Sequence, residues 1–260
     1  WFGTDPIAGS DCDDTEASIH PGAPDLGIHD RNCDGLVESI MSSAEHVING
    51  SDSFLGRMVS RRPGDYDGDG RYDILSTTSQ EILLLSGVRV DGAVLEDTHP
   101  FLIELTSYHY VFAEFLGDID GDGLDDIAAL SDSTLFILLG NTLKFIPPGS
   151  FELEDMADYS FNHVNTDSYY RHAITGVPDI DGDGDAEILV GNAEDCEAFL
   201  IYSSSLYPGA PSTVSGVADY HFQGTCSDYI DGAGEAIAAA DDIDGGGKPD
   251  LIISDKRHDS

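Results

Sequence analysis

Four aspartate-rich segments of this chain share one internal spacing. Each places acidic side chains at positions 1, 3 and 9 and glycine at position 6, and the first three also have an aspartate at position 5. Carboxylates at these offsets, completed by the backbone carbonyl of position 7, supply the all-oxygen shell that calcium prefers, while the glycine permits a sharp turn. The predicted ligand residues are Asp65, Asp67, Asp69, Arg71 and Asp73; Asp118, Asp120, Asp122, Leu124 and Asp126; Asp179, Asp181, Asp183, Asp185 and Glu187; and Asp242, Asp244, Lys248 and Asp250.

The repetition of this spacing favours calcium loops over plain turns. A single Asp-Gly cluster is an ordinary turn former, but four copies with one spacing are not expected from turns alone. The fourth loop has Gly246 in place of the acid at position 5, so we expect it to bind most weakly or to stay empty. An EF-hand is excluded because it needs a bidentate glutamate at position 12. That position is occupied by Ser76, Ala129, Val190 and Ile253.

The elements that position these loops are predicted to be short β-strands. Successive loops begin 53, 61 and 63 residues apart, which indicates one structural unit copied along the chain. An apolar run of strand length follows each loop, as in Asp126–Leu130, and further runs complete each unit. Four short strands per unit is the pattern of a propeller blade, so the predicted fold class is all-β.

The net charge of the chain limits the classes of partner that it can bind. The 260 residues include 50 Asp and Glu but only 11 Lys and Arg, a formal charge of −39, while 40% of the residues are hydrophobic. Such a chain can form a core, yet it repels phosphate backbones and anionic headgroups. No apolar stretch approaches the length of a membrane-spanning helix. We therefore expect no nucleic acid partner and no membrane insertion.

The segments Gly64–Leu75 and Gly117–Ala128 carry the core Gly-Asp-x-Asp-Gly-Asp-Gly-x-x-Asp followed by an apolar strand. By this core the sequence resembles the FG-GAP family, whose repeats build the N-terminal propeller of integrin alpha chains and occur in many bacterial surface proteins. The resemblance implies that residues 54–260 are propeller repeats with calcium in the hairpin between a blade's first two strands. We expect blades at about 54–107, 108–157 and 158–224 and a partial blade at 225–260. About three and a half blades suggest part of a seven-bladed ring, with two associating arcs as the alternative.

Residues 1–40 interrupt the repeat and carry a further candidate site. Asp30, Asn32, Asp34 and Glu38 occupy positions 1, 3, 5 and 9 of another oxygen-rich loop. The segment resembles the MopE-type metal-binding repeat, by its Asp-Cys-Asp-Asp, Pro-Gly-Ala-Pro and Asn-Cys-Asp-Gly elements. Residues 41–53 are interpreted as a linker. Together with the repeats, this gives three to five expected Ca²⁺ sites.

Four cysteines indicate disulfide bonds. They allow three pairings, and the local one joins Cys12 to Cys33 and Cys196 to Cys226. A bridge in the N-terminal segment would stabilise a piece too short to bury a core. No Cys-x-x-Cys or Cys/His zinc spacing is present, so disulfides are favoured over zinc. This places the protein outside a reducing cytosol, at an extracellular or bacterial cell-surface location.

The sequence has no motif of a known catalytic type, such as GxSxG, HExxH or a glycine-rich phosphate loop. We therefore expect a non-enzymatic, calcium-dependent module for adhesion or for binding an extracellular protein or glycan. Two alternatives stay open. One is the propeller part of a secreted polysaccharide-acting enzyme, and the other is a purely structural repeat made rigid by calcium.

Overall fold

The computed structural model describes residues 58–78, 80–87, 102–107, 111–131, 133–162, 172–193, 195–224 and 233–255. They belong to one of the two compact units into which the chain divides, the unit made of residues 50–90 and 95–260. The N-terminal segment, the predicted linker and their candidate ligands Asp30, Asn32, Asp34 and Glu38 lie outside the described residues.

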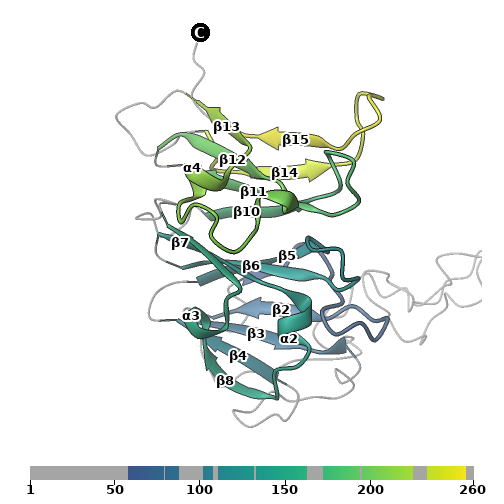
Figure 1. Cartoon of the computed structure of the whole chain (residues 1–260), viewed down its shortest axis with the longest axis vertical. Helices are drawn as coiled ribbons and strands as arrows, with labels where there is room; N and C mark the ends of the chain where they lie inside the picture. Colours follow the sequence, from purple (N-terminus) through teal and green to yellow (C-terminus); the bar gives the residue numbers. More distant parts are fainter. Residues whose placement is uncertain are drawn as a thin grey trace, which may run out of the picture. The chain divides into compact units, whose positions relative to one another are not determined.

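The described residues form four β-sheets (Figure 1). The first sheet has the strand order β1-β2-β3-β4-β8, and the others follow as β5-β6-β7-β9, β10-β11-β12-β13 and β14-β15. The strand bounds are β1 Met58–Val59, β2 Ile74–Thr77, β3 Glu81–Leu85, β4 Leu102–Thr106, β5 Val111–Gly117, β6 Asp126–Ser131, β7 Thr134–Leu138, β8 Gly149–Glu152, β9 Tyr159–Asn162, β10 His172–Val177, β11 Glu187–Asn192, β12 Glu197–Ile201, β13 Tyr220–Gln223, β14 Ile237–Ala240 and β15 Asp250–Ile253.

Consecutive strands within each sheet pair in antiparallel fashion, which is the arrangement expected of a propeller blade. The prediction of a mostly β fold built from four-stranded antiparallel units is thereby confirmed. The fourth sheet has two strands among the described residues. The seven-bladed ring stays a prediction.

One pairing departs from this regular pattern. Strand β8 follows β7 in sequence, yet it lies parallel to β4 and extends the first sheet. The second sheet is then completed by β9, which pairs with β7 and ends at Asn162, beyond residue 157 where the second repeat was expected to end. A segment of the second repeat thus fastens the first two sheets together.

Short helical turns lie in the connections that follow β7, β8 and β12. They are α2 Gly140–Leu143, α3 Leu153–Met156, the 3-10 turn η2 Ser203–Ser205 and α4 Val214–Val217. The side chain of Thr213 caps α4 by accepting a hydrogen bond from the Gly216 N–H. In the part of the chain that the structure describes, no helix is long and apolar enough to cross a membrane.

Three apolar clusters lie where successive sheets pack face to face. Phe115, Leu75 and Leu138 belong to the cluster between the first two sheets. The next cluster joins the second and third sheets, and a smaller one joins the third and fourth. Strands buried on both faces explain why their sequences are continuous apolar runs rather than alternating patterns.

The second and third sheets approach so closely that strand β10 requires a glycine, Gly176. A Cβ atom added to Gly176 of β10 would lie 1.8 Å from the Leu116 carbonyl oxygen of β5. No side chain fits this space, because the obstructing atom is backbone. The backbones of the second and third sheets are therefore in close contact at this point.

Candidate metal centre

All four acidic loops join the first two strands of a sheet, as the resemblance to FG-GAP repeats implied. They connect β1 to β2, β5 to β6, β10 to β11 and β14 to β15. In the second loop, Asp118 accepts hydrogen bonds from the N–H groups of Gly121 (2.8 Å) and Gly123 (2.8 Å). Equivalent bonds run from position 6 to position 1 in the other three loops. The first aspartate thus folds the chain around its own carboxylate.

Glycine at position 6 is required by the backbone conformation. Gly123 has φ +85°, in the left-handed region that side chains other than glycine adopt at a cost. The glycines at the same position of the other loops have φ between +85° and +105°. The turn therefore depends on glycine.

In the first two loops, the acid at position 9 is buried and accepts hydrogen bonds from two sides. Asp126 is 0% exposed and accepts hydrogen bonds from the N–H groups of Ile119 (2.7 Å) and Gly140 (2.6 Å). Ile119 lies within the loop, whereas Gly140 lies beyond the next hairpin. Asp73 makes the same pair of bonds in the first loop, to Tyr66 and Gly87. This carboxylate ties the first and second loops to their sheets.

Three or four of the predicted acids converge in each loop. One carboxylate oxygen from each member lies within 4.8 Å of the others. The four groups are Asp65, Asp67 and Asp73; Asp118, Asp120 and Asp122; Asp179, Asp181, Asp183 and Glu187; and Asp242, Asp244 and Asp250. Asp69 and Asp126, also predicted as ligands, are not members of these groups.

The third loop holds the clearest sign of an unsatisfied site. Glu187 is 0% exposed, and its Oε1 atom has no hydrogen-bond partner among the described residues. Its other oxygen accepts from the Ile180 N–H (3.0 Å). A buried carboxylate oxygen without a donor is costly, and here it belongs to a group of four acids. A bound cation would satisfy it, so these residues fit a metal ion.

Burial makes the negative charge of these loops costly. Burial is the largest cause that raises the pKa of Asp126 to about 8, and neighbouring aspartates of the loop add to it. The pKa of Asp73 is raised to about 7 and that of Glu187 to about 7 for the same reasons. A divalent cation would favour the charged forms and remove this penalty.

Side chains outside the loops hold individual acids in place. Ser86 donates to Asp67 (2.9 Å), Asn141 donates to Asp120 (3.3 Å) and Ser203 donates to Asp183 (3.1 Å). All three donors follow the third strand of their sheet. The spacing within the loops carries no signal for these contacts, because the donors lie 19 to 21 residues from the acids they hold.

Adjacent loops are bonded to one another. The Asp125 N–H donates to the Asp65 carbonyl oxygen (3.0 Å), and the Ala186 N–H donates to the Asp118 carbonyl oxygen (2.7 Å). In both cases position 8 of one loop meets position 1 of the preceding loop. The first three loops therefore form a continuous row.

The fourth loop is the most exposed of the set. Asp242 and Asp244 are both exposed, and Gly246 donates its N–H to Asp244 (2.7 Å) at the position where the other loops have an acid. Asp250 accepts from the Ile243 N–H (2.7 Å), as position 9 does elsewhere. The fourth loop keeps the hydrogen bonds that shape the turn, but it lacks an acidic ligand at position 5.

One of the four cysteines, Cys196, lies among the described residues. Cys196 is buried and disulfide-bonded, and it has a positive φ of 58°. Its predicted partner Cys226 lies outside the described residues, as do Cys12 and Cys33. The pairings stay predictions.

The fold and its loops define a class of protein: antiparallel four-stranded sheets that resemble propeller blades and carry acidic clusters able to hold metal ions. Within it, residues 118–190 match the family described as FG-GAP-like repeat. This range runs from the second acidic loop through the third, so the sequence resemblance to FG-GAP repeats is confirmed there. The MopE-type resemblance of residues 1–40 stays a prediction.

Among solved structures, the chain is similar to one chain of a crystal structure of BBS1N in complex with ARL6DN, soaked with lead. The sequence identity is 14% and the TM-score is 0.41. The match covers 80% of this chain and 52% of that chain, so it spans about half of the other chain's length.

Proposed function

We propose that this protein is a calcium-binding module whose repeated loops each present a Ca²⁺ site at the same place in a blade. The observation that carries the proposal is the buried, unpartnered Glu187 oxygen within a group of four acids. The same loop spacing and the same anchoring of position 9 in all four repeats extend the proposal to the other loops.

The donor set favours calcium over other common metals. Every member of the four groups is a carboxylate, with neither histidine nor cysteine among them. Hard oxygen ligands suit Ca²⁺ and Mg²⁺, whereas zinc favours nitrogen and sulfur. The loops offer up to four carboxylates and a backbone carbonyl, which suits calcium's larger oxygen shell better than the well-hydrated Mg²⁺.

In this proposal the calcium loops rigidify a scaffold that binds an extracellular protein or glycan, and the module itself is not an enzyme. Its setting is extracellular or the bacterial cell surface, where millimolar calcium saturates weak sites. The strongly negative charge and the absence of a catalytic motif in the sequence support this role. Antibody labelling of intact cells of the source organism tests the location, and a signal only after lysis would contradict it.

Thermal unfolding of matched variants tests calcium binding at the third loop. Calcium raises the melting temperature of a protein that binds it only when folded. We expect this rise to be smaller for Glu187→Gln than for the parent protein. Glu154→Gln removes one exposed acid of α3 and should leave the rise unchanged. Equal rises for the parent and Glu187→Gln would contradict a site at this loop.

A further inference from the structure

A buried glutamate of β5 holds two neighbouring arginines, Arg61 and Arg62, beside strands β5 and β10. Glu114 of β5 is 2% exposed, and its Oε1 accepts from the Arg61 N–H (2.8 Å), the Arg62 N–H (3.0 Å) and the Ser60 hydroxyl (3.0 Å). Its Oε2 is 3.4 Å from the Arg61 Nε. The backbone N–H bonds of Arg61 and Arg62 and the ion pair between Arg61 and Glu114 thus hold the segment after β1 against the second sheet.

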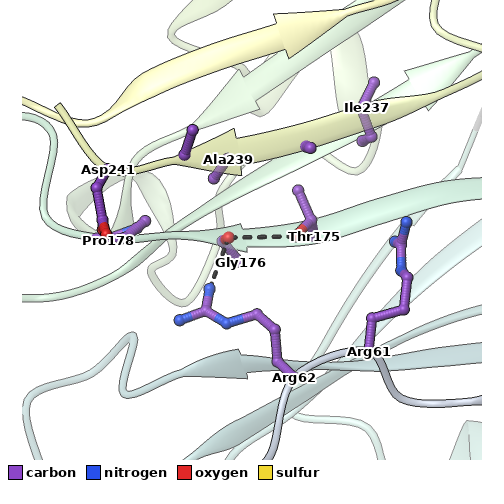
Figure 2. Close-up of a pocket in the computed structure, with 10 residues that line it drawn as sticks. Arg61, Arg62, Thr175, Gly176, Pro178, Ile237, Ala239 and Asp241 are labelled. Atoms are coloured by element: carbon purple, nitrogen blue, oxygen red, sulfur yellow. Dashed lines mark hydrogen bonds between the residues drawn. The ribbon is translucent and has the colours of Figure 1, made fainter. Parts of the chain in front are cut away.

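Both guanidinium groups then reach the third sheet. Arg61 donates to the Ile174 carbonyl oxygen (2.8 Å), and Arg62 donates through one terminal nitrogen to the Gly176 carbonyl oxygen (2.7 Å). Figure 2 shows the Arg62 guanidinium directed at Gly176, while its second terminal nitrogen carries no bond to the residues drawn. Carbonyl oxygens hold the side chains in place without neutralising their charge.

These side chains line a cavity of about 470 Å³ between β10 and β14 (Figure 2). Its opposite wall is made of the small residues Ala238–Ala240 together with Ile237. Pro178 and Asp241 stand together on the side away from Arg61 (Figure 2). A volume of this size accommodates a small molecule or a few residues of a peptide.

Positive charge is available in the cavity despite the acidic surroundings. Arg62 forms no ion pair with a described residue, although its charge partly offsets the rise that burial causes in the pKa of the nearby Asp125. The Arg61 guanidinium is 3.4 Å from Glu114 through its Nε, and the Arg61 side chain is 56% exposed. Two of the 11 basic residues of a chain with charge −39 are therefore adjacent at one cavity. Fixed guanidinium groups suit a carboxylate because their paired N–H donors match its two oxygens.

We propose that this cavity binds the carboxylate of an acidic side chain on an extended peptide segment of a partner. Strand β10 pairs with β11 along one edge, and the carbonyls of Ile174 and Gly176 face the arginines on the other. The N–H groups of these two residues point the same way as their carbonyls, because a strand residue directs both groups to one side. They offer donors to an added peptide backbone.

The charges favour one isolated carboxylate over a polyanion. Asp241 at the far side of the cavity repels a second negative group, and the net charge of −39 repels polyanions as a whole. Asp241 can instead accept an N–H of a peptide. The proposal goes beyond calcium binding and uses residues that are outside the acidic loops.

Isothermal titration of the calcium-saturated full chain tests the proposal. The probe is an acetylated and amidated pentapeptide, Ala-Ala-Glu-Ala-Ala, compared with the same peptide carrying glutamine. We expect the glutamate peptide to bind, and both the glutamine peptide and the Arg62→Gln variant to bind about tenfold more weakly or worse. Lys144→Gln removes one exposed charge at the end of α2 and should leave affinity unchanged. Equal affinity for the two peptides, or no binding, would overturn the proposal.

A second variant and a second ligand complete the test. Ala240→Leu narrows the cavity and leaves both arginines in place, so it should abolish binding even if Arg62→Gln fails to fold. Retained affinity in this variant would contradict the proposed site. Trigalacturonate supplies carboxylates on a sugar chain, and tighter binding of this ligand than of the peptide would refute the peptide assignment. Calcium titration of the same samples reports separately on the loops.

Discussion

Asp65 and Asp125 join the first two acidic loops by a reciprocal pair of hydrogen bonds. The Asp125 N–H donates to the Asp65 carbonyl oxygen (3.0 Å), and the Asp65 N–H donates to the Asp125 Oδ2 (2.7 Å). Asp65 is also the residue around which the first loop folds. The geometry of one loop is therefore supported by a side chain of the next.

Replacing Asp125 should affect the first loop although Asp125 is not a predicted ligand. Asp125→Ala removes the acceptor for the Asp65 N–H, and we expect a loss of about 1 to 2 kcal/mol in the free energy of unfolding. Calcium affinity at the first loop should fall as well. Urea unfolding and calcium titration measure the two effects. Asp155→Ala, at an exposed position of α3, is the control, and equal behaviour of both variants would contradict the coupling.

Positions 5 and 9 of the second loop should have separable roles. Asp126 is buried and accepts from two N–H groups, so Asp126→Ala leaves both without their acceptor and should cost about 2 kcal/mol even without calcium. Asp122 is exposed, so Asp122→Asn should change metal-free stability little and weaken calcium binding. Chemical unfolding in a chelator and in calcium compares them. The same loss of stability in both variants without calcium would be inconsistent with this division.

Metal-free stability should decrease as pH rises. The pKa of Asp126 is raised from 3.8 to about 8 by burial, so the folded state holds this proton more tightly than the unfolded state does. Asp73 and Glu187 behave in the same way with pKa values of about 7. Their contribution is present below pH 4 and is lost as pH rises through 7 to 8.

Calcium should weaken this pH dependence. A bound cation favours the charged carboxylates, so saturating calcium should flatten the decrease between pH 4 and 8, and calcium affinity should rise over the same range. Melting temperatures measured across this range with chelator and with calcium provide the test. A metal-free stability that increases from pH 5 to 8 would show that these acids are not protonated in the folded state.

The loops and their flanking strands could be predicted because their signal is local. The Asp-Gly spacing between Asp118 and Asp126 specifies the turn, and an apolar strand follows directly. The repeat then indicated four short strands in each unit. Convergence of the acids at positions 1 and 3 of each loop followed from the same spacing.

The remaining features depend on contacts between distant parts of the chain. Strand β8 pairs with β4 because the connection after α2 returns to the first sheet, and nothing in Gly149–Glu152 indicates that partner. The hydrogen bonds that Glu114 accepts from Arg61 and Arg62 join residues more than 50 positions apart in the sequence. Buried polar groups find partners through the tertiary fold, so their pairing has no fixed spacing.

The central claim, that the repeated acidic loops bind calcium, is tested most directly by isothermal titration of the metal-free protein with Ca²⁺. We expect three to five sites, with affinities on the order of 10⁻³ M or tighter, as extracellular calcium modules have. Glu187→Gln should remove one site from the count. No binding heat and no saturable site would contradict the claim and leave the Asp-Gly repeats as turns alone.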